Sequence, residues 1–503
     1  MSAEVELANF SSAEVFHRRE NADRAGDASP SSIQEVEREH PSGTVNDTVG
    51  STEASLPPVD MGRHAWLFCV CCCLCEMLIW GWNNTYGVFQ DYYTSHPPFN
   101  TASAAAISSV GTTSLGIQYM EAVLVMAFAQ RYPEYVKHMM WITLGICSAA
   151  LFLSSFATQV WRLILLQGVV FGVAAGAMYA PVLIWIPDWF VNRRGLAAGL
   201  IFGGAGLAGF AFPLIMGYLL KGVGFRWTLR IWALALGVTG GLAILGVNPR
   251  VPIRKSTMPI PREPWLPRDL SHFKSPLLYS MLAISILQAL SYFPVSILIS
   301  TYTSSLSSAT LPSTVVLAIF NVSSSLSYLL FGRISDSYPY PYIIFVSGLG
   351  SALAAFFVWG FASSLTLVFA FAAIFGGFSG GIAAIWPAAG TDIGGSRDHI
   401  TSLAMGCFSG FKGIGATIGP IIAASLYDTQ STAKTVYGGF GFRKVEIFVG
   451  KNSYKQSRHS VFSLDLIKHL RIYGCCNEPE RIDFEFSFNF QEEVDMIQMS
   501  RML

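Results

Sequence analysis

The stretch WFVNRRGLAAGLIFGGAGLAGF, residues 189–210, shows most clearly how this chain folds. Two arginines, Arg193 and Arg194, stand at the start of an apolar run that extends over 194–220. At a rise of about 1.5 Å per residue, such a run crosses the roughly 30 Å hydrocarbon core of a bilayer as a helix. Its glycines recur at steps of three and four residues and share one helix face: Gly199, Gly203, Gly206 and Gly209. Small residues let a second helix approach closely, so we expect a membrane span with a packing and sliding surface.

The composition of the whole chain also indicates a membrane protein. Of its 503 residues, 52% are hydrophobic and only 13% are charged, whereas about a quarter of an average soluble protein is charged. Lys and Arg together number 32, as do Asp and Glu. This balance lacks the basic surplus of nucleic-acid-binding proteins.

Apolar blocks of about twenty to twenty-seven residues follow one another from Ala65 onward, each long enough to span a bilayer. We therefore expect an all-α polytopic membrane protein with eleven spans: 65–89, 103–129, 138–157, 161–186, 194–220, 226–247, 276–301, 312–331, 341–360, 364–389 and 401–427.

A polar loop at 248–275 divides these spans into six and five. We expect a disordered cytosolic tail at 1–60, because this polar segment cannot bury enough apolar surface to fold. An N-terminal half at 61–247 and a C-terminal half at 276–427 follow, and an atypical polar tail occupies 428–503.

Basic residues mark one end of the predicted helices. About twelve lie in loops on the side of the N-terminal tail, among them Arg131, Lys137, Arg333, Arg397 and six in the central loop. Only three lie on the other side, at Arg162, Lys221 and Arg226. Since positive charge favours the cytosol, we expect the tail and the central loop to be cytosolic.

Several motifs resemble one known family. The opening stretch is similar to the fifth-helix signature of the monocarboxylate porter family within the major facilitator superfamily, and most similar to its fungal branch. Shorter matches support this: Gln167-Gly168, Gly172, Gly176, Tyr179-Ala180-Pro181, Tyr86-Gly87-Val88-Phe89-Gln90 and Gly332-Arg333-Ile334-Ser335-Asp336. The resemblance covers about 60 to 427. It implies twelve helices in two halves, a central cavity and alternating access.

The sequence departs from this family at four places. The lead-in to the first helix is loose, with Asp60 and Gly62 followed by Trp66. The loop at 129–131 lacks a glycine and an aspartate, and the eighth span has no charge where mammalian lactate carriers have an Asp and an Arg. We expect the twelfth helix to be missing, because no apolar run approaching twenty residues follows position 443.

Three ionisable residues lie deepest in the predicted spans: Glu76, Glu121 and Lys412. A charge at that depth costs several kcal/mol and marks function or pairing. By helical rise, Lys412 lies at a similar depth to both carboxylates, so it could pair with Glu121 or with Glu76, or hold an anionic substrate.

Uncharged polar residues extend this candidate site. Glu76, Asn83 and Asn84 share one face of the first span, and a polar face in lipid must turn inward. We predict that these residues line a cavity with four others, or alternatively form interhelical hydrogen bonds: Gln288, Tyr292, Asn321 and Trp386.

Loop motifs form a second group of candidates. Arg193 and Arg194 either anchor the topology or form a gate with loop acids such as Asp188. The Gly332-Arg333…Asp336 motif is the second predicted gate element.

Five of the nine cysteines crowd into the first predicted span, where they cannot take the spacing of a tetrahedral zinc site, and the histidines form no cluster. No phosphate-binding glycine loop is present. We therefore expect no cofactor, no metal and no enzymatic activity.

The sequence predicts a monomeric secondary transporter of a small organic solute, monocarboxylate-like or another metabolite, in uptake or efflux. Proton coupling stays open, as does the choice between the plasma membrane and an internal membrane such as the vacuole. The alternative is a truncated, non-transporting remnant or a membrane sensor.

Overall fold

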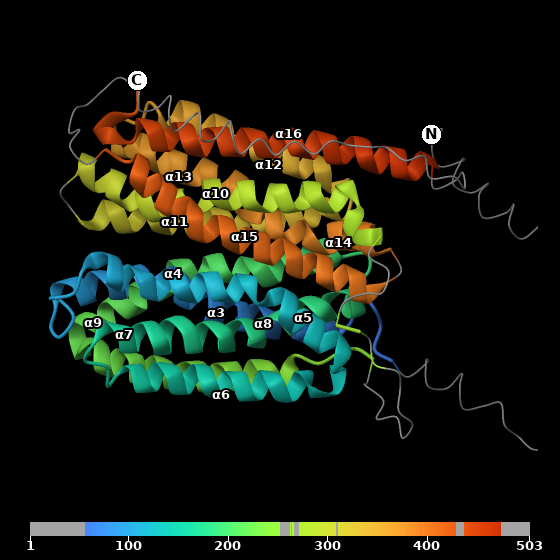
Figure 1. Ribbon diagram of the computed structural model, residues 1–503, viewed down its shortest axis with the longest axis horizontal. Helices are drawn as coiled ribbons and strands as arrows, with labels where there is room; N and C mark the ends of the chain where they lie inside the picture. Colours follow the sequence, from blue (N-terminus) through green and yellow to red (C-terminus); the bar gives the residue numbers. More distant parts are fainter. Residues whose placement is uncertain are drawn as a thin grey trace, which may run out of the picture. The chain divides into compact units, whose positions relative to one another are not determined.

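A computed structural model describes residues 56–251, 262, 264–265, 271–307, 310–395, 397–428 and 437–473. The predicted N-terminal tail up to residue 55 lies outside the described residues, as do most of the central loop and the end of the chain. Helices account for the described fold, and they lie side by side along one direction (Figure 1).

The first six predicted spans form the N-terminal half. Its helices are α3 (Arg63–Ser95), α4 (Ala104–Met120), α5 (Ala122–Arg131), α6 (Val136–Ser154), α7 (Val160–Leu163), the π-helix η2 (Ile164–Val170), α8 (Phe171–Trp189) and α9 (Arg194–Gly246). The long α9 contains two spans, because Gly224 with φ 75° and ψ 171° interrupts the helix between them. A positive φ favours glycine, which explains the sharp turn at this position.

The next five predicted spans belong to the C-terminal half. Its helices are α10 (Pro276–Leu306), α11 (Thr310–Ser335), α12 (Tyr340–Leu353) with the π-helix η4 (Ala354–Trp359), α13 (Leu365–Ser379), the 3-10 helix η5 (Gly380–Ile385), α14 (Trp386–Gly394), α15 (Asp398–Leu426) and α16 (Arg443–Tyr473). Ten of the described helices, counting α9 once, are long and apolar enough to cross a membrane. The prediction of an all-α polytopic fold is confirmed, and each of the eleven predicted spans is helical.

The polar tail contains a long helix that the sequence did not predict. Helix α16 packs along α10 and α12, and Figure 1 shows it beside α12. Its polar side chains meet polar partners: Ser463 Oγ lies 2.7 Å from Ser280 Oγ, and Gln456 Nε2 lies 3.4 Å from Ser347 Oγ. Helix α16 is not among the described helices that are apolar enough to cross a membrane, so it adds a sixth, polar helix beside the five predicted apolar spans of this half. Hydropathy alone could not find α16 because it lacks an apolar run.

The two halves meet along α9 with α11 and along α15 with α4 and α5. Gly199 packs against the carbonyl oxygen of Tyr328, and Gly206 packs against Ser325. A Cβ at either glycine would overlap these atoms, so the glycines allow α9 and α11 to cross closely. The predicted glycine face is thus a packing surface between the halves.

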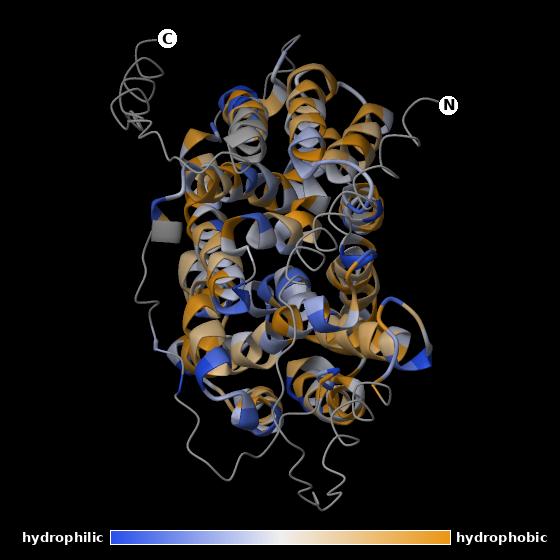
Figure 2. Ribbon diagram, turned by 90° about the vertical axis from the view of Figure 1, so that its right-hand side faces the viewer, coloured by the Kyte–Doolittle hydropathy of each residue, from blue (hydrophilic) through white to orange (hydrophobic). Residues whose placement is uncertain are grey.

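Several of the arginines at helix starts and ends lie at one end of the bundle, where Arg194 bonds to Thr391 and Arg333 lies near Asp336. We call this end, which carries Arg131, Arg193, Arg194, Arg333 and Arg397, the basic end. Figure 2 views the bundle from this end and shows hydrophobic residues along the helices.

Candidate functional site

A small chamber lies where the two halves meet. Its volume is about 60 Å³. It is lined from the N-terminal half by Glu76, Trp80, Asn84, Leu115, Tyr119, Tyr179, Phe202, Ala205 and Gly206, and from the C-terminal half by Tyr292, Phe293, Ser324, Tyr328, Ala383, Trp386 and Lys412. Helices from both halves therefore build one site.

Aromatic rings form two walls of the chamber. The first wall joins α8, α3 and α4: Trp80 lies 5.6 Å from Tyr179 and 4.4 Å from Tyr119, measured between ring centroids. It continues from Tyr119 onto α10 through Phe293, at 6.2 Å, and then Tyr292.

The second wall joins α9 to α11 and α14. Phe202 lies 5.9 Å from Tyr328 and 6.5 Å from Trp386, again between ring centroids. The 3-10 helix η5 positions Trp386, the first residue of α14, in this wall. Its glycines Gly380 and Gly381 allow the backbone to pack closely against Ser324 and Ser327 of α11. Both walls contain residues of both halves, so a relative movement of the halves would reshape them.

Lys412 lies between the two walls. Its side chain is only 4% exposed, and its Nζ lies 5.4 Å from the ring centroid of Trp386 and 5.8 Å from that of Tyr119. Such contacts are attractive because the face of an aromatic ring carries negative charge. Among the described residues, no carboxylate oxygen lies within 4.0 Å of Nζ.

Glu76 is the acidic residue of the chamber and is 3% exposed. It interacts electrostatically with Lys412, without a direct ion-pair contact. Three polar atoms of the chamber are buried without a hydrogen-bond partner in the described structure: Glu76 Oε2, Trp80 Nε1 and Trp386 Nε1. Buried polar groups normally have partners, so each of these exceptions calls for an explanation, such as a bound water or ligand.

Five of the eight predicted cavity residues line the chamber: Glu76, Asn84, Tyr292, Trp386 and Lys412. The other three form hydrogen bonds between helices. Asn83 donates to Gln118 Oε1 at 2.9 Å, Gln288 to the Ser379 carbonyl at 2.8 Å, and Asn321 to the Gly209 carbonyl at 3.0 Å. These three contacts match the alternative interpretation considered for the polar residues.

Glu121 does not pair with Lys412 in this structure. It lies at the break between α4 and α5, and its carboxylate packs against Gly176 of α8. The carboxylate thus faces α8 and not the chamber, because depth along a helix does not decide which side of the helix a residue faces.

The sequence analysis missed most of the aromatic lining, namely Tyr119, Tyr179, Phe202, Phe293 and Tyr328. Aromatic residues are common in apolar helices and carry no periodic signal that separates a chamber wall from ordinary packing. Their gathering around a buried lysine is visible only in three dimensions.

The basic end carries hydrogen bonds between the halves. The Asp336 carboxylate accepts from the backbone N–H of Gly195 at 2.6 Å and of Leu196 at 3.0 Å, at the N-terminus of α9. A helix N-terminus favours negative charge, and its first N–H groups lack partners within the helix. Gly332 and Gly195 approach so closely that a Cβ on either would overlap the other residue.

The two predicted gate arginines differ in their surroundings. Arg194 donates to Thr391 Oγ1 of α14 at 2.7 Å, so it bonds across the halves rather than forming the predicted gate pair with Asp188. Arg193 is exposed, as is Arg333, which interacts electrostatically with Asp336. Gln130 donates to Ser402 Oγ at 2.9 Å and adds another bond between the halves.

A larger cavity of about 340 Å³ opens at the basic end. Its lining includes Gln130, Asp188 and Arg194 from the N-terminal half and Thr391 and Asp398 from the C-terminal half. These polar and charged residues give the basic end a hydrophilic space between the halves.

Asp60 binds the segment directly before α9, which belongs to the N-terminal half as Asp60 does. It accepts hydrogen bonds from the backbone N–H groups of Val191, Asn192 and Arg193 at 2.9 to 3.1 Å. Burial alone would raise the pKa of Asp60, but these hydrogen bonds outweigh it and hold the pKa below its ordinary value. This aspartate belongs to the loose first-helix lead-in.

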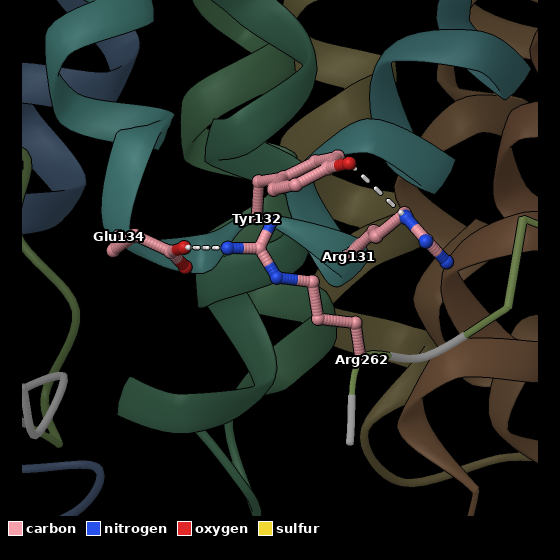
Figure 3. Close-up of polar contacts among 4 residues, drawn as sticks. All are labelled: Arg131, Tyr132, Glu134 and Arg262. Carbon is pink, nitrogen blue, oxygen red and sulfur yellow. Dashed lines mark hydrogen bonds and ion pairs between the residues drawn. The ribbon is translucent and has the colours of Figure 1, made fainter. Parts of the chain in front are cut away.

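A small polar cluster ties the central loop to the connection between α5 and α6 (Figure 3). Arg262 lies 3.5 Å from Glu134 and stacks on Tyr132 at 4.5 Å from its ring centroid. Arg131 Nε donates to the hydroxyl of Tyr132 at 3.3 Å. The described part of the central loop therefore lies at the basic end.

Comparison of the sequence with known proteins identifies relatives of this chain. A family description named Major Facilitator Superfamily matches residues 65–391. The chain is 29% identical over 338 residues to the MFS transporter asaE of Aspergillus flavus, covering 66% of this chain and 73% of that protein. It is 27% identical over 397 residues to the aspyridones efflux protein apdF of Emericella nidulans, covering 78% and 76%. It is 25% identical over 413 residues to the probable transporter MCH2 of Saccharomyces cerevisiae, covering 80% and 83%.

Proposed function

The chain belongs to the Major Facilitator Superfamily, and on this premise we propose that it is a secondary active transporter of a small organic solute. The observation that carries the proposal is the buried Lys412 between two aromatic walls that both halves build. A charge held at such depth is costly, so it is retained where it performs a function.

Alternating access explains the dimensions of the chamber. A volume of about 60 Å³ has room for roughly two water molecules, whereas sites for organic ligands occupy about 300–1,000 Å³. The chamber is contracted here, and a solute enters when the halves move apart. The hydrogen bonds of Asp336 and Arg194 at the basic end break when the halves open on that side.

The proposed direction of transport is supported by the name of one relative. The positive-inside pattern assigns the basic end to the cytosol, so this conformation is closed on the cytosolic side. The name of apdF describes efflux, which supports export of a metabolite. We propose the same direction for this chain, acting as a monomer.

Glu76 is the proposed site of a coupling proton. It lies in the chamber with one carboxylate oxygen unpartnered, and it is the acidic residue that interacts with Lys412. Protonation of Glu76 would change the net charge of the chamber by one unit, so solute binding and proton binding would depend on each other. The narrower resemblance to monocarboxylate porters remains a prediction.

One observation favours the alternative of a non-transporting remnant or sensor. Helix α16 is polar, although it packs on α10 and α12 as a further helix of the C-terminal half. A half weakened by such a helix could retain its fold and lose transport.

Comparison of metabolites inside and outside cells tests the proposal for any small solute, whatever its identity. Cells that naturally make the chain are compared with a deletion strain and with the same strain carrying the wild-type gene. We expect at least one small organic compound to accumulate in deletion cells and to return to the medium on complementation. An unchanged distribution of every compound would favour the remnant or sensor.

A further inference from the structure

Among the described residues, the ammonium group of Lys412 has no direct acceptor, and Glu76 acts on it only electrostatically. It has three N–H donors, yet among the described residues it contacts ring faces and forms no ion pair. Ring faces compensate only part of the cost of taking a cation out of water. An acceptor of negative charge therefore complements this position, and the chamber leaves space for it to come from a ligand.

Two further donors lie in the same chamber. The indole N–H groups of Trp80 and Trp386 are buried without partners, whereas buried indole N–H groups usually find an acceptor. Trp386 contacts Lys412 directly, and Trp80 packs at a tilt against Tyr119, the other ring beneath the ammonium. Three donor groups thus surround one chamber, an arrangement that suits a ligand group with two adjacent oxygens.

A ligand in the chamber would face mainly aromatic rings, because the aliphatic side chains of the lining are three, Leu115, Ala205 and Ala383. The first wall contributes five rings and the second three, all of them lining the chamber. Ring faces and edges attract other π-systems beyond the area that they bury. A flat conjugated molecule can make such contacts with both walls, and a saturated molecule of the same size cannot.

From these observations we propose that the chamber binds a flat, conjugated organic anion, of the class of aromatic carboxylates and conjugated enolates. Its anionic oxygens contact Lys412 and the indole N–H groups of Trp80 and Trp386, while its ring system lies against the aromatic walls. This proposal rests on the proposed transport function and specifies its substrate class.

Binding to the purified full-length chain in lipid nanodiscs tests the class directly. The probes are 2-naphthoate, the neutral 2-naphthamide and the saturated decahydro-2-naphthoate, measured by calorimetric titration. We expect 2-naphthoate to bind about tenfold more tightly than either of the other two. Equal affinity for the amide would overturn the charge requirement, and equal affinity for the saturated acid would overturn the requirement for a conjugated body. A failure of 2-naphthoate to bind would also reject the proposed class.

Two variants assign the preference to the chamber. Lys412→Gln should abolish the preference for the acid over the amide while retaining amide binding. Trp386→Phe, which keeps a ring and removes the N–H, should weaken acid binding several-fold. The matched controls are Lys221→Gln and Trp161→Phe, which lie outside the chamber lining and should bind as wild type does. Retention of the full acid preference in Lys412→Gln would place the anion elsewhere.

These experiments distinguish a failure of the proposed substrate class from a failure of the proposed transport function. If complementation restores export of a compound but 2-naphthoate does not bind, the chain transports a different class of solute. If 2-naphthoate binds through Lys412 but no compound is redistributed in cells, the binding proposal stands and the transport proposal fails.

Discussion

The Asp336 carboxylate accepts a 2.6 Å hydrogen bond from the backbone N–H of Gly195, although the two residues belong to opposite halves of the bundle. With the second bond to Leu196, this contact ties α11 to the N-terminus of α9. In the proposed transport cycle it breaks each time that the basic end opens.

Asp336→Asn should therefore favour the state that is open at the basic end. Asparagine has one acceptor oxygen where aspartate has two, and a lost hydrogen bond costs about 0.5–1.5 kcal/mol, so the population of that state should rise several-fold. Maleimide labelling of an Ala129→Cys variant measures this, because Ala129 lines the cavity at the basic end and is 4% exposed. Asp91→Asn at the other end is the matched control. Equal labelling rates with and without Asp336→Asn would show that the contact does not control opening.

The two aspartates that bind the start of α9 should respond differently to acid. Burial raises the pKa of Asp336, and its hydrogen bonds offset this only in part. The pKa of Asp60, in contrast, is lowered by its hydrogen bonds. The ionised form of Asp60 therefore stabilises the fold above its unfolded pKa of about 3.9, and this contribution is lost as the pH falls through the lower folded pKa.

From these directions, Asp60→Asn should lower thermal stability at pH 7 more than the matched change Asp336→Asn does. The deficit of Asp60→Asn should shrink as the pH falls below about 4. Thermal unfolding of both variants between pH 7 and 3 measures the difference. A larger loss of stability at pH 7 for Asp336→Asn would contradict the assignment.

Lys412 should be coupled energetically to Glu76 and not to Glu121. The structure brings Glu76 into the chamber and directs Glu121 toward Gly176. We predict that Glu76→Gln combined with Lys412→Gln is more stable than either single variant, because neither charge is left unpaired. Glu121→Gln combined with Lys412→Gln should show additive effects. Non-additivity of the Glu121 pair, measured by thermal unfolding, would restore that residue as the partner.

The central loop should face the cytosol. Arg262 contacts Glu134 and Tyr132 at the basic end, and the positive-inside pattern assigns this end to the cytosol. A protease site inserted between residues 255 and 265 should be cleaved only from the cytosolic side. The same site inserted near Lys221 should be cleaved only from outside intact cells. The opposite pattern would invert the proposed orientation.

The apolar helices were predictable from sequence because their lengths and compositions are set by the bilayer. Helix α16 was not, since hydropathy counts its serines and glutamine as polar even though Ser463 and Gln456 bond to partners on α10 and α12. The interruption of α9 at Gly224 was located correctly by the gap between two apolar blocks.

The candidate site was predictable only in part. Costly charges such as Glu76 and Lys412 stand out in an apolar helix, and both line the chamber. Asn83 lies near Glu76 along α3 but bonds to Gln118 of α4 and does not line the chamber. The sequence alone does not show which polar residue lines the chamber and which one bonds to a neighbouring helix. The rotation of each helix about its axis, which decides this, depends on packing between helices that are distant in sequence.

Export by Lys412→Ala is the most direct test of the central claim that the chamber is the transport pathway. The deletion strain is complemented with wild type, Lys412→Ala or the exposed control Lys221→Ala, and the compound restored to the medium by wild type is quantified at equal abundance of each protein in the membrane. We predict that Lys412→Ala restores none of this export and that Lys221→Ala restores all of it. Full export by Lys412→Ala would contradict the claim and leave the lysine without a role in transport.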